Sequence, residues 1–148
     1  LDFQKALYYI NKAIHIDAEN VLYWKRYAKI NYRLKFYEEA EKGYRRTLEL
    51  GNYELETWLT HADILLYLEE TDAAITILSQ ALEFYPENVE IMFRLSGLNY
   101  IKCDDIQGRF FLKTALMIDP DFSIILEELF PYAYSKKEVK ELLAKYSS

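Results

Sequence analysis

A repeat with a period of 34 residues constrains this chain more than any other feature. The segment "AIHIDAEN" from Ala13 has counterparts in "TLELGNYE" from Thr47, "ALEFYPEN" from Ala81 and "ALMIDPDF" from Ala115, and each start lies 34 residues after the previous one. A fixed period of this length indicates one small structural unit that is stacked several times, because a single unit cannot bury both of its apolar faces.

Each unit contains two amphipathic helical patterns separated by a short turn. In the unit that begins at Val21, Trp24, Tyr27 and Ala28 are spaced by three and four residues, which places them on one helix face. Small residues recur at three fixed places, where they let neighbouring helix backbones approach to about 8–10 Å. These residues are Ala28, Ala62 and Ser96 at the eighth place, Ala40, Ala74 and Gly108 at the twentieth, and Thr47, Ala81 and Ala115 at the twenty-seventh.

These units resemble the tetratricopeptide repeat family, whose 34-residue helix-turn-helix carries Trp, Leu, Ala, Tyr and Pro at fixed places. The resemblance covers residues 1 to 122 and implies an all-α fold of antiparallel helix pairs stacked in a right-handed superhelix, an α-solenoid. The closing proline of the family pattern is present at Pro86 and Pro120, whereas Ala18 and Asn52 replace it in the two earlier copies.

The register of the repeat divides the chain. Residues 1–20 form the second helix of a truncated repeat, 21–54, 55–88 and 89–122 are full repeats, and 123–148 form C-terminal capping helices. We expect one solenoid domain that is a piece of a longer protein. Within the cap, Pro131 ends a first short helix. Ser135 and Glu138 have the spacing of a capping box at the start of a second one.

Composition excludes several classes of function. The net charge of −6 argues against a nucleic-acid surface, which needs a basic stripe. No run of 18 apolar residues occurs, so we predict a soluble chain without a membrane span. Cys103 is the only cysteine, which supports neither an internal disulfide nor a cysteine metal site and favours the reducing cytoplasm.

The residues do not predict an enzyme. His15 and His61 lie in different units, and no zinc-protease, phosphate-loop or nucleophile-elbow motif is present. His61 lies on an apolar helix face, which indicates a hydrogen-bonded core histidine. Cys103 is followed by Asp104 and Asp105, which disfavour a reactive thiolate. We therefore expect no catalytic residues, no cofactor and no metal site.

Binding is the better interpretation. In the family that the chain resembles, the first helix of each unit lines a concave face that holds peptides. Carried over to this sequence, that face comprises the following candidate site residues: Lys25, Arg26, Lys29, Arg33, Thr60, Asp63, Tyr67, Phe93, Arg94 and Tyr100. The first four are cations on one stripe, since Lys25, Lys29 and Arg33 are spaced by four residues.

The charge pattern predicts an acidic or C-terminal-carboxylate peptide at the cationic end, with an apolar side chain against Phe93 and Tyr100. The alternative is a solvated face whose cations are neutralised by nearby acids. At the level of function, we expect a protein-interaction scaffold with protein or peptide partners. The alternative is a self-assembling segment, including a homodimer formed through the truncated N-terminal helix.

Overall fold

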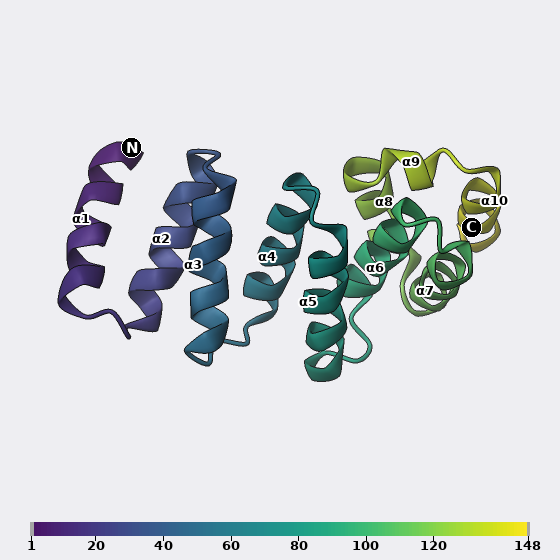
Figure 1. Ribbon diagram of the computed structural model, residues 1–148. Coiled ribbons are helices and arrows are strands. Elements are labelled where there is room, and N and C mark those ends of the chain that lie inside the picture. Colours follow the sequence, from purple (N-terminus) through teal and green to yellow (C-terminus); the bar gives the residue numbers. More distant parts are fainter. Residues whose placement is uncertain (1, 148) are drawn as a thin grey trace. The chain divides into compact units, whose positions relative to one another are not determined.

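The computed structural model describes residues 2–147, which form helices joined by short turns and contain no strand (Figure 1). The prediction of an all-α fold is confirmed. No helix among these residues has an apolar stretch long enough to cross a membrane. The helices are α1 (Phe3–Ile16), α2 (Val21–Arg33), α3 (Tyr37–Glu49), α4 (Leu55–Tyr67), α5 (Thr71–Phe84), α6 (Val89–Ile101), α7 (Asp105–Ile118), α8 (Ile124–Leu129), α9 (Pro131–Tyr134) and α10 (Lys137–Tyr146), with a 3₁₀ turn at Pro120–Phe122.

The chain forms two compact units that divide between Glu70 and Thr71. The first unit holds α1 to α4 and the second holds α5 to α10. This division falls inside the repeat at 55–88, whose two helices belong to different units. The single solenoid domain stays a prediction.

Asparagine side chains start two of the first helices of the repeats. The Asn20 side chain accepts hydrogen bonds from the backbone N–H groups of Leu22 and Tyr23, at 3.0 and 3.3 Å. Asn88, which lies two repeats after Asn20, accepts one from the backbone N–H of Ile91 at 3.0 Å. Each bond satisfies a backbone donor that a helix start leaves without a partner. Two of the three repeats therefore share the chemistry of the helix start, whereas α4, which follows Glu54, has no side-chain cap.

The turn inside each repeat has a residue in the left-handed backbone conformation at the same place. Lys35, Glu69 and Cys103 have φ angles of 62°, 60° and 63° and are the non-glycine residues with positive φ in the described part of the chain. In each turn the next residue donates a backbone hydrogen bond five residues back, as Phe36 does to Asn31 at 2.9 Å. This is a Schellman motif, whose left-handed position normally prefers glycine.

In the first unit, α2 and α3 pack as an antiparallel pair (Figure 1). Ala28, Ala40 and Tyr44 are at most 2 % exposed and form a core with Ile64 of α4. A Cβ atom on Gly43 would lie only 2.8 Å from the Cβ of Ala28, so the two helix backbones are as close as their side chains allow. The small residues of the repeat thus face the neighbouring helix, as the sequence predicts.

In the second unit, α6 is the central helix and packs against α5, α7, α8 and α9. Ser96 donates a hydrogen bond to the backbone oxygen of Gly108 at 2.7 Å, which ties α6 to α7. The C-terminal residues lie over α6 on the other side, where the ring of Phe130 covers Gly97. α10 packs against α7 and closes this end of the unit.

The predicted capping box at Ser135 is wrong. α10 starts after Lys136, and no side chain caps it. The Ser135 hydroxyl instead donates back to the carbonyl of Tyr132 at 2.7 Å. Glu138 accepts two hydrogen bonds from Arg109 of α7, at 3.1 and 2.9 Å. A tertiary ion pair between α7 and α10 therefore takes the carboxylate that a local cap would need.

Candidate functional site

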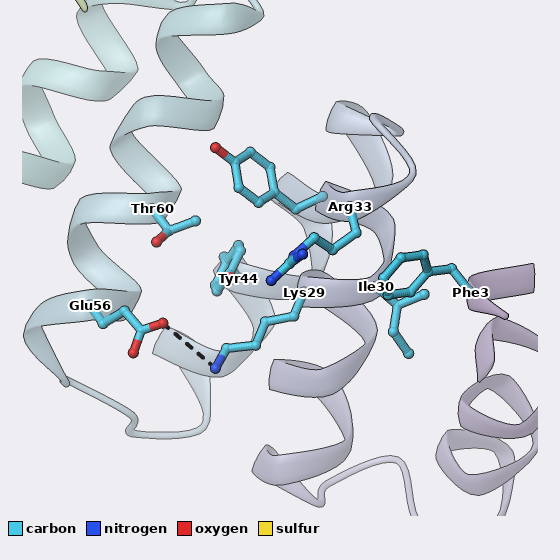
Figure 2. A pocket seen from close by; sticks show the side chains of 8 residues that line it. Phe3, Lys29, Ile30, Arg33, Tyr44, Glu56 and Thr60 are labelled. Carbon is cyan, nitrogen blue, oxygen red and sulfur yellow. Dashed lines mark ion pairs between the residues drawn. The ribbon is translucent and has the colours of Figure 1, made fainter. Parts of the chain in front are cut away.

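A pocket of about 380 Å³ lies in the first unit, where α2 faces α4 (Figure 2). Lys29 and Arg33 extend from α2 toward α4, from which Glu56 and Thr60 face them (Figure 2). The pocket is lined by Phe3, Lys29, Ile30, Tyr32, Arg33, Tyr44, Glu56 and Thr60. It therefore brings together three of the candidate site residues from two helices.

Helical spacing explains why these side chains converge. Lys29 and Arg33 are four residues apart on α2, and Glu56 and Thr60 are four residues apart on α4, so each pair lies along one helix face. Tyr44 is 2 % exposed, because its ring belongs to the core of the unit while the residue also lines the pocket. A rigid core thus supports one wall of the pocket.

Two of the four predicted cations are already neutralised. Lys25 pairs with Glu54 at 2.6 Å, and Lys29 pairs with Glu56 at 3.6 Å. The Lys25 ammonium, through its hydrogen bond and its charge, lowers the pKa of Glu54. These two pairs match the alternative of a solvated face neutralised by nearby acids. Both acids lie at the start of α4: Glu54 directly precedes the helix and Glu56 lies in its first turn.

The two arginines differ from the lysines. Neither Arg26 nor Arg33 makes an ion pair with any residue that the structure describes, and both are exposed. Arg33 lines the pocket between α2 and α4, whereas Arg26 lines a separate groove beside α1. The cationic stripe is therefore divided: Arg33 faces the pocket with its charge available, and Lys29 joins it there through a long, exposed pair with Glu56.

Tyrosine hydroxyls add hydrogen-bond donors to this end of the unit. Burial, and then the negative charge of Glu56, raise the pKa of Tyr44 to about 12. Burial and the neighbouring Tyr32 raise the pKa of Tyr67 to about 12 as well. Both hydroxyls therefore stay protonated at neutral pH and can donate to an acceptor.

The other two predicted residues of α4 lie outside the pocket lining. The ring of Tyr67 is 44 % exposed and packs against Tyr37, with ring centroids 5.2 Å apart. Asp63 is partly buried, one turn after Thr60 on the same helix. These residues continue the face of α4 beyond the pocket.

The predicted residues of α6 do not line an open surface. Phe93 and Tyr100 are both 0 % exposed, which corrects the expectation that a ligand side chain would pack against them. Two neighbours cover α6. The ring of Tyr100 packs on Gly108 of α7, and α8 and α9 pack on α6, where Phe130 occupies the space over Gly97. Arg94 is partly buried and donates a hydrogen bond to the carbonyl of Glu90 at 3.1 Å.

Five pocket residues are absent from the sequence-based set, namely Phe3, Ile30, Tyr32, Tyr44 and Glu56. Tyr32 carried a usable signal, because it occupies the same twelfth place of its repeat as Tyr100, which the sequence did suggest. Phe3 carried none, because it lies in the half repeat, whose first helix is missing from the pattern.

The histidine prediction is confirmed. His61 is 1 % exposed, and its Nε2 lies 3.4 Å from a carboxylate oxygen of Glu41. Its ring stacks on Tyr44 with the centroids 6.4 Å apart.

Across residues 2–147, no group of three or more His, Cys, Asp or Glu side chains could hold a metal ion.

Comparisons with known proteins agree with this architecture. Residues 55–98 match the family model described as tetratricopeptide repeat. The crystal structure of MamA aligns over 98 % of this chain and 84 % of its own, with a TM-score of 0.79 and 19 % identity. The crystal structure of YrrB, described as a TPR protein with an unusual peptide-binding site, aligns over 97 % of this chain and 74 % of its own, with a TM-score of 0.76 and 17 % identity.

No protein of curated function matches the sequence. The family match identifies a tetratricopeptide repeat at residues 55–98, and the two crystal structures show that the chain shares the fold of YrrB, a TPR protein, and of MamA.

Proposed function

We propose that this chain is a non-catalytic protein-interaction module that binds an acidic or C-terminal-carboxylate peptide in the pocket between α2 and α4. One observation carries this proposal: Arg33 faces the pocket without an ion pair to any described residue. An arginine guanidinium binds a carboxylate through two parallel hydrogen bonds, which makes it the side chain best suited to such a ligand.

The other pocket residues suit the same ligand. Phe3 and Ile30 provide apolar surface next to Arg33, so the side chain that precedes the carboxylate can pack there rather than on α6. Lys29 is bound to Glu56 only through an exposed pair at 3.6 Å, which is worth less than about 1 kcal/mol and exchanges readily for a ligand anion. Peptide binding is described for YrrB, a protein of the same fold, which supports this class of function.

The test is a peptide array in which the last four positions sample acidic, basic, neutral and apolar residues, each peptide with a free carboxylate and as its amide. We expect the chain to prefer acidic peptides with free carboxylates. Arg33→Glu should weaken their binding about tenfold or more, which corresponds to about 1.4 kcal/mol or more.

Arg45→Glu is the control for a charge reversal outside the pocket lining, with circular dichroism to show that the loss of its ion pair with Glu41 leaves the fold intact. It should leave the binding of the array unchanged. A preference for basic or neutral peptides, or equal losses for the two variants, would refute the proposal.

Self-association is the second candidate function, and the exposed apolar surface of α1 favours it. Tyr8, Tyr9 and Ile16 are 54 %, 58 % and 85 % exposed. Exposed apolar groups clustered on one element are typical of an interaction surface. This candidate is compatible with peptide binding, because the pocket opens between α2 and α4.

A further inference from the structure

The solvent side of α7, in the second unit, carries a stripe of large apolar side chains. We call it the α7 stripe, and it consists of Ile106, Phe110, Lys113 and Met117. Their spacing of four, three and four residues places them on one helix face. The three apolar side chains are 74 %, 58 % and 71 % exposed, in that order. The residues that α7 buries are Gly108, Leu112, Ala115 and Leu116, on the opposite face. α7 is therefore apolar on two faces, whereas a surface helix normally keeps one of them polar.

The earlier repeats show that the fold does not require apolar residues at these places. The counterparts of the α7 stripe are Asp72, Thr76, Ser79 and Glu83 in α5, and Glu38, Lys42, Arg45 and Glu49 in α3. All of these counterparts are exposed, as the stripe itself is, and every one of them is polar. Helices α3 and α5 thus take their places in the repeat with a polar outer face. The apolar residues of the α7 stripe must therefore serve something other than the stacking of helices.

The helices that pack on α7 leave the stripe open. Both α6 and α10 contact α7, and Arg109, next to Phe110 in the sequence, pairs with Glu138 of α10 at 2.9 Å. The core side of α7 and its side toward α10 are thus occupied, and the stripe stays exposed. Large exposed apolar groups gathered on one element are typical of an interaction surface. This surface is separate from the Arg33 pocket, whose lining belongs to the first unit.

We propose that the α7 stripe binds one amphipathic helix of a partner protein, which places an acidic side chain opposite Lys113. The spacing of the stripe is that of the a and d positions of a two-helix seam. From Ile106 to Met117 the seam is about 16 Å long, which matches three turns of a partner helix. A single polar residue in such a seam fixes the register of the two helices, because it needs a polar partner at one place.

Charge decides what kind of helix fits. Lys113 is exposed and makes no ion pair with any residue that the structure describes, so its ammonium is available to a ligand. Once a helix covers the seam, that ammonium loses water and needs an anion to compensate it. An aspartate or glutamate at the facing position of the partner supplies this anion through a charge-assisted hydrogen bond.

The same charge disfavours a second copy of the chain as the occupant. Two copies with parallel α7 helices set Lys113 against Lys113. Two copies with antiparallel helices set Lys113 against Phe110 when the ends of the stripes coincide. The stripe contains no acidic residue, so in neither orientation does it offer the buried ammonium an anion. A different chain with an acidic seam position is therefore the better match.

Synthetic helical peptides test the proposal. The first probe has leucine at every a and d position except the central one, which is glutamate, and alanine and glutamine at all other positions. The second probe has lysine in place of that glutamate. Both are acetylated and amidated, so neither offers a terminal carboxylate to the Arg33 pocket. In fluorescence anisotropy titrations with labelled peptides, we expect the glutamate peptide to bind about tenfold or more tightly than the lysine peptide.

Substitutions locate the binding on the α7 stripe. Lys113→Glu should reverse the preference, so that the lysine peptide binds more tightly. Phe110→Thr, which introduces the residue type of the same place in α5, should weaken the binding of the glutamate peptide about tenfold or more. Lys5→Glu is the matched control, because Lys5 is an exposed lysine of α1 in the first unit. This control and Arg33→Glu should leave the binding unchanged, and circular dichroism should show that all variants keep their helix content.

Several results would overturn the proposal: binding of neither peptide, equal binding of both, or a Lys113→Glu variant that still prefers the glutamate peptide. A dimer of the unmodified chain in sedimentation velocity that Phe110→Thr dissociates would assign the stripe to a second copy and overturn the proposal as well. Loss of the glutamate peptide in Arg33→Glu would place its binding in the other pocket. Failure of the free-carboxylate peptides at Arg33 leaves these results unaffected, so the two proposals fail separately.

Discussion

Gly97 lies directly under the ring of Phe130, with no room for a side-chain carbon between them. A Cβ atom at position 97 would fall far inside van der Waals contact with three atoms of that ring. This contact explains why the C-terminal segment covers α6, since the missing side chain creates the space in which Phe130 is 98 % buried, with 2 % of its surface exposed.

Gly97→Ala should therefore destabilise the chain by about 1–3 kcal/mol, the usual cost of forcing a carbon into a packed core. On an open helix the same substitution stabilises by about 1 kcal/mol, because alanine favours the helix. Urea unfolding of Gly97→Ala in the natural and the Phe130→Ala backgrounds separates the two effects. The substitution should destabilise the first background and be neutral or stabilising in the second, and a loss of equal size in both would contradict the contact.

Lys35→Gly should stabilise the chain by about 0.5–1 kcal/mol. Lys35 has a φ of 62°, and a left-handed conformation costs a residue with a side chain roughly 1–2 kcal/mol more than it costs glycine. Part of this gain is offset because glycine makes the unfolded chain more flexible. Lys42→Gly is the control, because Lys42 lies inside α3. This variant should lose about 1 kcal/mol of stability. Thermal unfolding that shows the same sign for both variants would refute this explanation of the turn.

Glu41 should contribute to the acid sensitivity of the first unit. The hydrogen bond from His61 is the main cause that lowers the pKa of Glu41. A lowered pKa in the folded state means that this stabilisation is complete above the ordinary glutamate pKa of about 4.3. It is lost as the pH falls through the lower folded value.

We expect Glu41→Gln to lower the free energy of unfolding by about 1 kcal/mol at neutral pH. Between about pH 5 and 3, the variant should then lose less stability than the natural chain. Glu38→Gln, an exposed change on the same helix, should keep the pH dependence of the natural chain. Denaturant titrations across this pH range measure both effects. Parallel pH profiles for the natural chain and Glu41→Gln would show that Glu41 does not contribute.

The helices of the repeat could be predicted because its small residues are needed wherever two helices pack closely. Ala28, Ala40 and Ala74 are all 0 % exposed, as expected of residues that let helices approach closely. A period of 34 with these residues in register therefore predicts where the helices lie before any contact is known. The prediction holds wherever the chain repeats itself.

The C-terminal segment was less predictable because it leaves the repeat register. Phe130 is placed by its contact with Gly97, and Glu138 is placed by Arg109, which precedes it by 29 residues. Neither contact has a counterpart in an earlier repeat from which it could be inferred. The sequence consequently suggested an open surface at Phe93, where the structure has a buried one.

The sequence contains a signal that predicts the ion pairs of the cationic stripe. Glu54 and Glu56 stand just before and just after the start of α4, and their partners Lys25 and Lys29 lie on the first helix of the preceding repeat. Charge spacing between consecutive first helices would have identified these pairs. Arg33, which has no such acid opposite it, would then have remained as the free cation of the pocket.

The central claim is that an acidic peptide binds through Arg33 in the pocket between α2 and α4, and its most direct test is a ¹H–¹⁵N NMR titration. The probe is an acetylated peptide of glutamate and serine residues that ends in leucine with a free carboxylate, and its amide is the control. The claim predicts peak shifts at Lys29, Arg33 and Thr60 that weaken with the amide and disappear in Arg33→Glu. Shifts confined to α6 and α7, or shifts at the pocket that persist in Arg33→Glu, would contradict it.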